Sequence, residues 1–388
     1  MFLLCFGAVR AGHEKFTLNW NILLIFTNGF LLFSSQRINL SLLELFPFLL
    51  VAVLEVPLQW LFGEHYSWRS SFWGIFTLGM TILNVSLMVR RGYGKYLWKV
   101  INFVSLFTVT CLFIQIAFRF VGIRLDRIPF FADTLFKAWE FSASFRPCAT
   151  FSEPSHLAEM CLLSAYYYLL VEKKFKTALI LIVGTILSTS SLGILGSVLL
   201  LVLYVMTLDR NSNIGTIKKW IIILFSLALC VIVLLWVGST DNWVVQRILG
   251  GGTSSTRIWR AFDLFNEIDS LEKVIGIGIQ NAEIYLNHYG IILNHDTYET
   301  VKVNREFMQT LGYVLCTTGI LGFGLFLYPF IRMILKMDYR MKSLCLMFLF
   351  VCFTCCIFSR HIFAIYLIAI YAVRDMVKCE MGSVAFGT

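Results

Sequence analysis

The stretch Val237–Arg305, which contains the run GGGTSSTRIWRAFDLFNE at positions 250–267, decides how this chain is organised. It holds six Lys or Arg and eight Asp or Glu in 69 residues, and it lies between the apolar runs 220–236 and 306–334. Such a segment cannot lie in lipid, where unpaired polar groups are costly. We therefore expect an extramembrane loop, and loops on a rigid scaffold often carry functional residues.

The rest of the chain has the composition of an integral membrane protein. Of its 388 residues 58% are hydrophobic and only 14% are charged, whereas soluble domains carry about 25% charged residues. A membrane-spanning helix needs roughly 20 mostly apolar residues. We predict an all-α polytopic protein, a single transmembrane domain over 1–388 with external loops at 119–154 and 237–305, the larger partly helical. About eleven transmembrane helices are predicted, at 17–34, 38–60, 71–89, 98–118, 155–171, 177–190, 191–207, 220–236, 306–334, 341–357 and 362–373.

Two of these segments are less regular than the others. The apolar run 177–206 is interrupted by Ser188-Thr189-Ser190-Ser191, so we predict two short helices that meet at a polar elbow. The last segment is short and is expected to end before Arg374.

The distribution of positive charge predicts the topology. If the 69-residue loop is external, the short internal turns hold 15 Lys or Arg; the external segments also hold 15, spread over far more residues. The positive-inside rule then places the N-terminus outside and the C-terminus inside. Eleven of the external cations are Arg and four are Lys, and Arg is the residue suited to bidentate binding of phosphate.

Several kinds of protein are excluded by the sequence. Most of the eleven Cys lie in apolar runs, where a free thiol behaves as a small hydrophobe, so we expect neither a disulfide framework nor a metal site. The chain has no P-loop, and Gly276-Ile277-Gly278 lacks the third glycine of a dinucleotide fingerprint and is predicted to be a turn. The charge distribution also argues against nucleic-acid binding.

One helix start is rich in polar residues. In the run RPCATFSEPSH at 146–156, Ser152 or Glu153 can cap a helix whose first position is Pro154. The free N–H groups of such a helix would form an anion site, with His156 and Glu159 on one face. The alternative is a capped transmembrane helix that binds nothing.

The loop 237–305 has its Arg residues near its start. Arg247 is followed by Arg257 and Arg260, which share a face of a predicted amphipathic helix, Ser255–Ile268. Leu264 is then the one apolar residue on the polar side. Arg260 could equally extend its side chain along the membrane surface.

Within the membrane, Glu44 and Glu55 are eleven residues apart and share one helix face. Carboxylates in this position suggest function unless they lie at the interface.

The chain resembles the O-antigen polymerase family (Wzy-type), to which O-antigen ligases are related. The resemblance rests on Arg146 followed by Phe-Ser-Glu-Pro-Ser-His156, on Ser-Thr-Arg-Ile-Trp-Arg-Ala-Phe262 with Val-Ile-Gly-Ile-Gly-Ile-Gln-Asn281, and on Thr-Thr-Gly-Ile-Leu-Gly322. These short motifs are spread over Arg146–Gly322, about half of the chain. The ligases tend to have His-Asn before the return helix, whereas this chain has Asn304-Arg305 there and His295 earlier.

The resemblance implies a metal-independent glycosyltransferase at the periplasmic face of the bacterial inner membrane, without a cofactor. It would join repeat units carried on undecaprenyl pyrophosphate, which serve as donor and acceptor, during lipopolysaccharide synthesis. The implied partners are these glycans, the bilayer and, as an option, a chain-length regulator protein; no nucleic acid is involved.

Roles for individual residues follow as hypotheses. Arg146 and Arg257 would bind the pyrophosphate, since Arg donors stabilise the negative charge on a leaving group. Glu153 or His156 would position or deprotonate the acceptor hydroxyl. The residues that could assist are Arg247, Arg260 and Arg305 at the pyrophosphate, and His295 and Glu159 elsewhere in the site.

Two alternatives remain open. A ligase would transfer finished polymer to lipid A–core. The acceptor distinguishes a ligase from a polymerase, and one sequence does not identify the residues that contact the acceptor. A transporter, such as a lipid-linked oligosaccharide flippase, would use Glu44, Glu55 and Glu159 as intramembrane charges, but the sequence lacks the internal repeats that many transporters have.

Overall fold

The computed structural model describes residues 20–33, 45–62, 67–122, 147, 149–151, 153–207, 253–293, 308–358 and 360–385. Within these ranges the chain forms helices and no strand, which confirms the all-α class. The helices of the first half are α2 (Trp20–Phe33), α3 (Phe46–Phe62), α4 (Trp68–Arg90), α5 (Gly94–Phe120), α7 (Pro154–Tyr166), the π-helix η1 (Tyr167–Val171), α8 (Phe175–Leu187) and α9 (Ser191–Thr207). Those of the second half are α12 (Thr253–Glu267), α13 (Ser270–Ile275), α14 (Ala282–His288), α16 (Thr310–Lys336), α17 (Tyr339–Thr354) and α18 (His361–Ala385).

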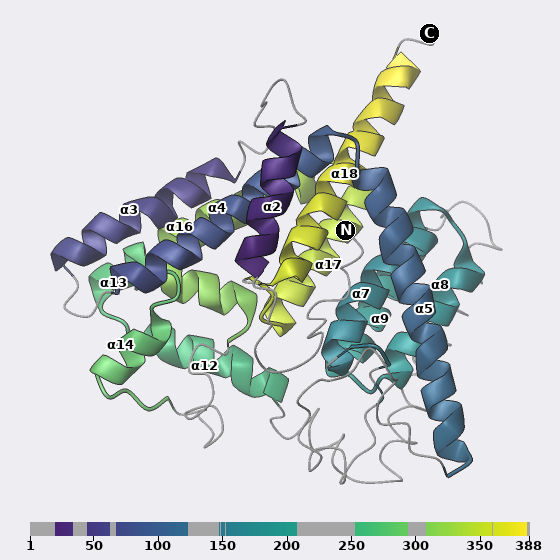
Figure 1. Ribbon diagram of the computed structural model, residues 1–388, viewed down its shortest axis with the longest axis horizontal. Coiled ribbons are helices and arrows are strands. Elements are labelled where there is room, and N and C mark those ends of the chain that lie inside the picture. The colour runs from purple at the N-terminus through teal and green to yellow at the C-terminus, as the bar shows by residue number, and fades with distance from the viewer. Residues whose placement is uncertain are drawn as a thin grey trace.

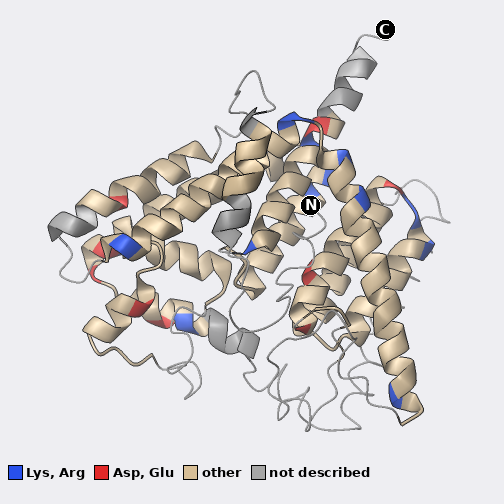
Figure 2. Cartoon of the chain, viewed as in Figure 1, with Lys and Arg blue, Asp and Glu red and all other residues tan. Residues whose placement is uncertain are grey.

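Each predicted span except 220–236, which lies outside the described residues, contains a helix. Three helices are long and apolar enough to cross a membrane, namely α4, α5 and α16, and shorter apolar helices occur at 46–57, 175–187 and 191–207. Figure 2 shows Lys and Arg gathered where α4 ends and α5 begins, whereas the bodies of the helices carry few charges. The described part of the predicted loop 237–305 consists of α12, α13 and α14.

The helices form two groups joined by a central pair. In one group α3 packs between α4 and α16, and α2 packs on α4; in the other, α7 contacts α5, α8 and α9. Between them, α18 contacts α4 and α5, and α17 contacts α9 and α16 (Figure 1). The helices of the predicted loop, α12 to α14, lie to one side in Figure 1, and α12 and α13 pack on α16.

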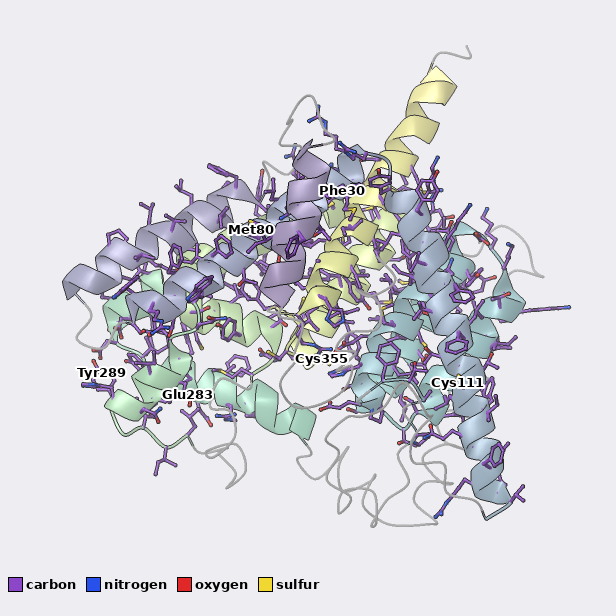
Figure 3. The ribbon with its side chains drawn as sticks, in the orientation of Figure 1. Phe30, Met80, Cys111, Glu283, Tyr289 and Cys355 are labelled. Carbon is purple, nitrogen blue, oxygen red and sulfur yellow. The ribbon has the colours of Figure 1, made fainter. Side chains whose placement is uncertain are left out.

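Buried amide side chains join α2 to α4. The Asn28 side-chain amide donates to the backbone carbonyl of Met80 at 2.9 Å, and the Asn84 side-chain amide donates to Asn28 Oδ1 at 2.9 Å. Figure 3 labels Met80, which lies beside α2. Because neighbouring helices in lipid gain little from apolar contact alone, such bonds help to select the partner helix.

The predicted elbow between two short helices is confirmed. α8 ends at Leu187 and α9 begins at Ser191, and Thr189 between them has a φ of 57°. The Ser188 hydroxyl donates to the Thr185 carbonyl at 2.7 Å and so satisfies one of the last carbonyls of α8.

The prediction for the last helix is wrong in length, because α18 continues past Arg374 to Ala385. The Arg374 guanidinium lies 4.4 Å from the Tyr371 ring centroid, and its Nε is 3.5 Å from an Asp375 carboxylate oxygen. These contacts allow a charged residue to continue the helix where composition alone suggested an end.

The prediction of one continuous helix over 306–334 also needs correction. α16 is interrupted at Gly319, which has φ 64° and ψ −175°, so two helical parts meet at a break. The backbone groups released there are bonded from another segment, because Ile277 N donates to the Cys316 carbonyl at 3.1 Å and Gly278 N donates to the Thr317 carbonyl at 2.9 Å.

Candidate functional site

The N-terminus of α7 begins the candidate site. Glu153 is extended and precedes Pro154 at the first helical position, as the sequence predicted. The Glu153 side chain does not cap the helix backbone; instead it accepts a hydrogen bond from the Ser155 hydroxyl at 3.0 Å. The Glu153 carboxylate is therefore held at the helix start, with its side chain 44% exposed.

The segment before α7 is fastened to α5. Ala149, in the left-handed region with a φ of 51°, donates its N–H to the Gln115 side-chain oxygen at 3.0 Å. The Thr150 and Thr108 hydroxyls are hydrogen-bonded at 3.0 Å. Arg146 and Ser152 lie outside the described residues. These buried bonds determine where the chain enters α7.

A bidentate ion pair joins α7 to the turn before α18. Arg360 Nη1 donates to Glu159 Oε1 at 3.0 Å, and Nη2 donates to Oε2 at 2.8 Å. The Glu159 side chain is only 1% exposed and that of Arg360 is 26% exposed. This fork geometry is the strongest arrangement of an Arg–carboxylate pair, and it leaves part of the guanidinium accessible.

Two histidines lie next to this pair. His156 Nε2 is 4.0 Å from Glu153 Oε2, and the His156 side chain is 26% exposed. His361, the first residue of α18, lies within electrostatic range of Arg360 and His156. Acidic, imidazole and guanidinium groups from two helix N-termini are thus gathered at one place, which is the arrangement needed for proton transfer beside a bound anion.

The turn 355–360 connects this cluster to the start of α16. The Cys355 carbonyl accepts from Thr310 N at 2.9 Å and from the Thr310 hydroxyl at 2.7 Å, and Ile357 N donates to the same hydroxyl oxygen at 2.8 Å (Figure 3). Thr310 is where the chain returns from the predicted loop 237–305. One short turn therefore contacts both α7 and the first residue of α16.

The amphipathic helix predicted at Ser255–Ile268 is present as α12, and Ala261 of its predicted apolar face is buried, but the predicted division into faces is only partly right. Arg260 and Leu264 are fully buried, whereas Phe262 is 45% exposed. The buried side is set by α16: a Cβ at Gly312 would overlap the Ala261 methyl group, and the Cys316 thiol donates to the Ala261 carbonyl at 3.3 Å. Leu264 is therefore in place on the buried face, and Arg260 lies on that face with it.

The predicted turn Gly276–Gly278 lies in the non-helical link Gly276–Asn281 between α13 and α14, and this link joins three elements. Its bonds to Cys316 and Thr317 hold the break in α16, and the Tyr313 hydroxyl accepts from Gln280 N at 2.8 Å. A Cβ at Gly74 of α4 would lie 2.6 Å from Ile279, and Ser67 N donates to the Asn281 side chain at 3.2 Å.

Among the described residues, Glu153, His156 and Glu159 lie together, with Arg260 buried in α12. Arg257 belongs to α12, but its side chain lies outside the described residues, as do Arg247, His295 and Arg305. Sequence reasoning missed Arg360 and His361. The available signal was their place between the predicted spans 341–357 and 362–373, where a cation and an imidazole are adjacent to an apolar helix.

The described residues contain no group of three or more His, Cys, Asp or Glu that could hold a metal ion. Comparison with protein-family models, curated proteins and solved structures gives no significant match for this chain.

Proposed function

We propose that this protein is a glycosyltransferase that polymerises undecaprenyl-pyrophosphate-linked repeat units at the outer face of the bacterial inner membrane. The observation that supports it best is the cluster of Glu153, His156, Glu159, Arg360 and His361 at the N-termini of α7 and α18. A lipid-linked pyrophosphate lies at the membrane surface, and this cluster supplies cationic and proton-accepting groups close to the predicted external loops.

The exposure and hydrogen bonds of Glu153, His156 and Glu159 indicate different roles for these residues. Both Glu159 oxygens accept from Arg360, and its side chain is enclosed, so Glu159 has no access to a sugar hydroxyl. We assign it to positioning Arg360. Glu153 and His156 are more exposed and are the candidates for the base that deprotonates the acceptor hydroxyl.

The pyrophosphate is assigned to Arg146 and Arg257, with Arg247 and Arg305 as assisting cations. Arg260 receives a structural role instead, because it is 0% exposed within α12. The turn 355–360 contacts Glu159 of α7 on one side and Thr310 of α16 on the other, so it joins the two helices that follow the predicted external segments.

The experiment is conversion by the purified full-length protein of lipid-linked repeat units into longer glycans. The wild-type protein should extend them without a nucleotide or an added divalent metal, and Arg257→Ala should reduce extension by at least 100-fold. Glu267→Gln, which alters an exposed acidic residue of the same helix, is the matched control and should keep wild-type activity.

The assay also separates the alternatives. If polymer is attached only when lipid A–core is offered as acceptor, the protein is a ligase. A transporter has specific support from the buried Glu55 and the broken helix α16, since transporter sites often lie at discontinuous helices. Movement of lipid-linked glycan across a vesicle membrane, without formation of longer glycans, would establish that class and refute the polymerase.

A further inference from the structure

Glu55 is a buried carboxylate within the apolar helix α3. It is 1% exposed, and neither of its carboxylate oxygens has a hydrogen-bond partner among the described residues. The neighbouring residues along α3 are Leu, Val and Pro. Burial of a charged group without a partner is strongly unfavourable, so such a carboxylate needs a positively charged or proton-donating ligand.

The register between α3 and α16 places Glu55 at the break. The Phe48 and Phe326 ring centroids are 5.3 Å apart, and a Cβ at Gly322 would lie 3.5 Å from Val51. Residue numbers rise along α3 as they fall along α16, so the two helices are antiparallel here. One further turn along α3 brings Glu55 opposite Thr318 and Gly319, where α16 is interrupted.

The break is rich in oxygen atoms. The Cys316 and Thr317 carbonyls no longer accept within a continuous helix and each receives one N–H from the segment 276–278. A carbonyl oxygen has two lone pairs, so each keeps capacity for a second ligand. On α4, the buried hydroxyl of Ser71 also has no partner within the described structure. Ser71 lies one turn before Gly74, which meets Ile279, the residue that follows the segment 276–278.

We propose that Glu55 and the interrupted backbone of α16 form a binding site for a small monovalent cation of the sodium class. Hard cations prefer oxygen ligands, and a carboxylate beside carbonyl groups of an unwound helix is the arrangement that holds sodium ions or protons in membrane proteins. The cation would neutralise Glu55 and join α3 to both parts of α16 and to the segment 276–278.

This cation site does not depend on the proposed polymerase activity. In an enzyme the ion would stabilise the break that supports α12 and α13, and in a transporter it would be a coupling ion. Among the described residues the site offers one carboxylate and no Cys thiolate or His imidazole as a ligand, which suits an alkali ion rather than a transition metal.

The test uses the purified full-length protein in detergent, unfolded thermally at constant pH and ionic strength in sodium chloride or choline chloride. Sodium at about one hundred times its Kd should raise the Tm of the wild-type protein by about 3–5 °C. Glu55→Gln should lose this sodium-dependent shift, whereas the exposed control Glu267→Gln should keep it. Glu55→Asp keeps the charge on a shorter side chain and should need about tenfold more sodium for half the shift.

Equal Tm values for the wild-type protein in sodium and choline would overturn the proposal, and so would a sodium shift that persists in Glu55→Gln. If lowering the pH stabilises the wild-type protein while sodium does not, Glu55 binds a proton and the cation site is refuted. If Glu55→Gln does not fold, the proposal is tested by the Tm shift of the wild-type protein in sodium and by the higher sodium concentration that Glu55→Asp needs for half of that shift. Glycan extension measured in choline reports on the enzyme separately, so failure of one proposal is distinguishable from failure of the other.

Discussion

Gly276 and Gly319 meet backbone to backbone where α16 breaks. A Cβ on Gly319 would lie 2.6 Å from Gly276 N and would overlap the Val274 carbonyl, and a Cβ on Gly276 would overlap the Thr317 carbonyl. Both residues have positive φ values, 90° for Gly276 and 64° for Gly319. The break therefore requires glycine at two positions that are 43 residues apart in the chain.

Replacing either glycine by alanine should destabilise the fold at the break. We expect Gly319→Ala to cost about 3 kcal/mol or more, because the strain of a positive φ adds to a clash with backbone atoms that cannot rotate away. Thermal unfolding in detergent measures the effect as a lower Tm.

Gly92 provides the matched control. It also has a positive φ, 67°, but a Cβ there would meet nothing within 4 Å. Gly92→Ala should therefore cost only about 1 kcal/mol. Equal losses for Gly92→Ala and Gly319→Ala would mean that the close approach at the break does not contribute.

The comparison between sequence and structure is clearest at these residues. The apolar runs and the polar elbow at 188–191 are local features, and the helices there agree with prediction. The run Thr317–Gly322 contains nothing that forbids a continuous helix; the break exists because backbone N–H groups from 277 and 278 bond its carbonyls. Local sequence cannot reveal an interruption that is completed by a distant segment.

The site was predictable to a similar extent. Glu153, His156 and Glu159 could be found because Pro154 marks a helix start, but Arg360 is 201 residues from Glu159. The faces of α12 were only partly predicted: Ala261 packs against Gly312 as an apolar residue should, but Leu264 is also buried and Phe262 is exposed. The burial of Arg260 is likewise a tertiary effect.

Substitutions of Glu159 and Arg360 should have strongly non-additive effects on the free energy of unfolding. Glu159→Gln leaves a guanidinium without its carboxylate, which costs about 3–5 kcal/mol for a buried pair and rather less here, because Arg360 is 26% exposed. Replacing both together, as Glu159→Leu with Arg360→Met, should recover most of the loss, since apolar pairs of similar size are tolerated. A double-mutant cycle of Tm values measures the coupling.

Glycan extension by that double variant separates two roles of the pair. We expect extension to remain at least tenfold below wild type although the fold is stable, because the guanidinium beside His156 and His361 is absent. Wild-type extension by the double variant would mean that the pair only fastens α7 to α18.

Glu153 and His156 should affect activity and not stability. Both side chains are partly exposed, at 44% and 26%, so Glu153→Gln and His156→Ala should each change the free energy of unfolding by less than about 0.5 kcal/mol. The variant that removes the base should lower the rate of glycan extension by about 10²–10⁴-fold. Initial rates at saturating lipid-linked substrate, with Glu283→Gln as an exposed control, test this. Near-normal rates in both variants would show that neither Glu153 nor His156 of α7 acts as the base.

The last prediction concerns the pH dependence of stability at Glu272 in α13. Burial raises the pKa of its carboxyl above the usual 4.5, Asp269 adds to the shift, and the Tyr285 hydroxyl opposes it. The folded protein then binds more protons here than the unfolded chain does, so this residue reduces stability as the pH rises from about 4.5 through the folded-state pKa. Glu272→Gln should therefore be more stable than wild type at pH 7, by on the order of 0.5 kcal/mol because the group is half exposed.

The gain from Glu272→Gln should disappear below about pH 4, where the carboxyl is protonated in both states. Unfolding curves of wild type, Glu272→Gln and Glu283→Gln at a series of pH values measure it. Glu283 lies exposed on α14 (Figure 3) and serves as a control for removing one carboxyl from this part of the chain. A Glu272→Gln variant that is less stable than wild type at pH 7 would show that the ionised carboxylate is stabilised by its hydrogen bonds, and the assigned direction of the shift would be wrong.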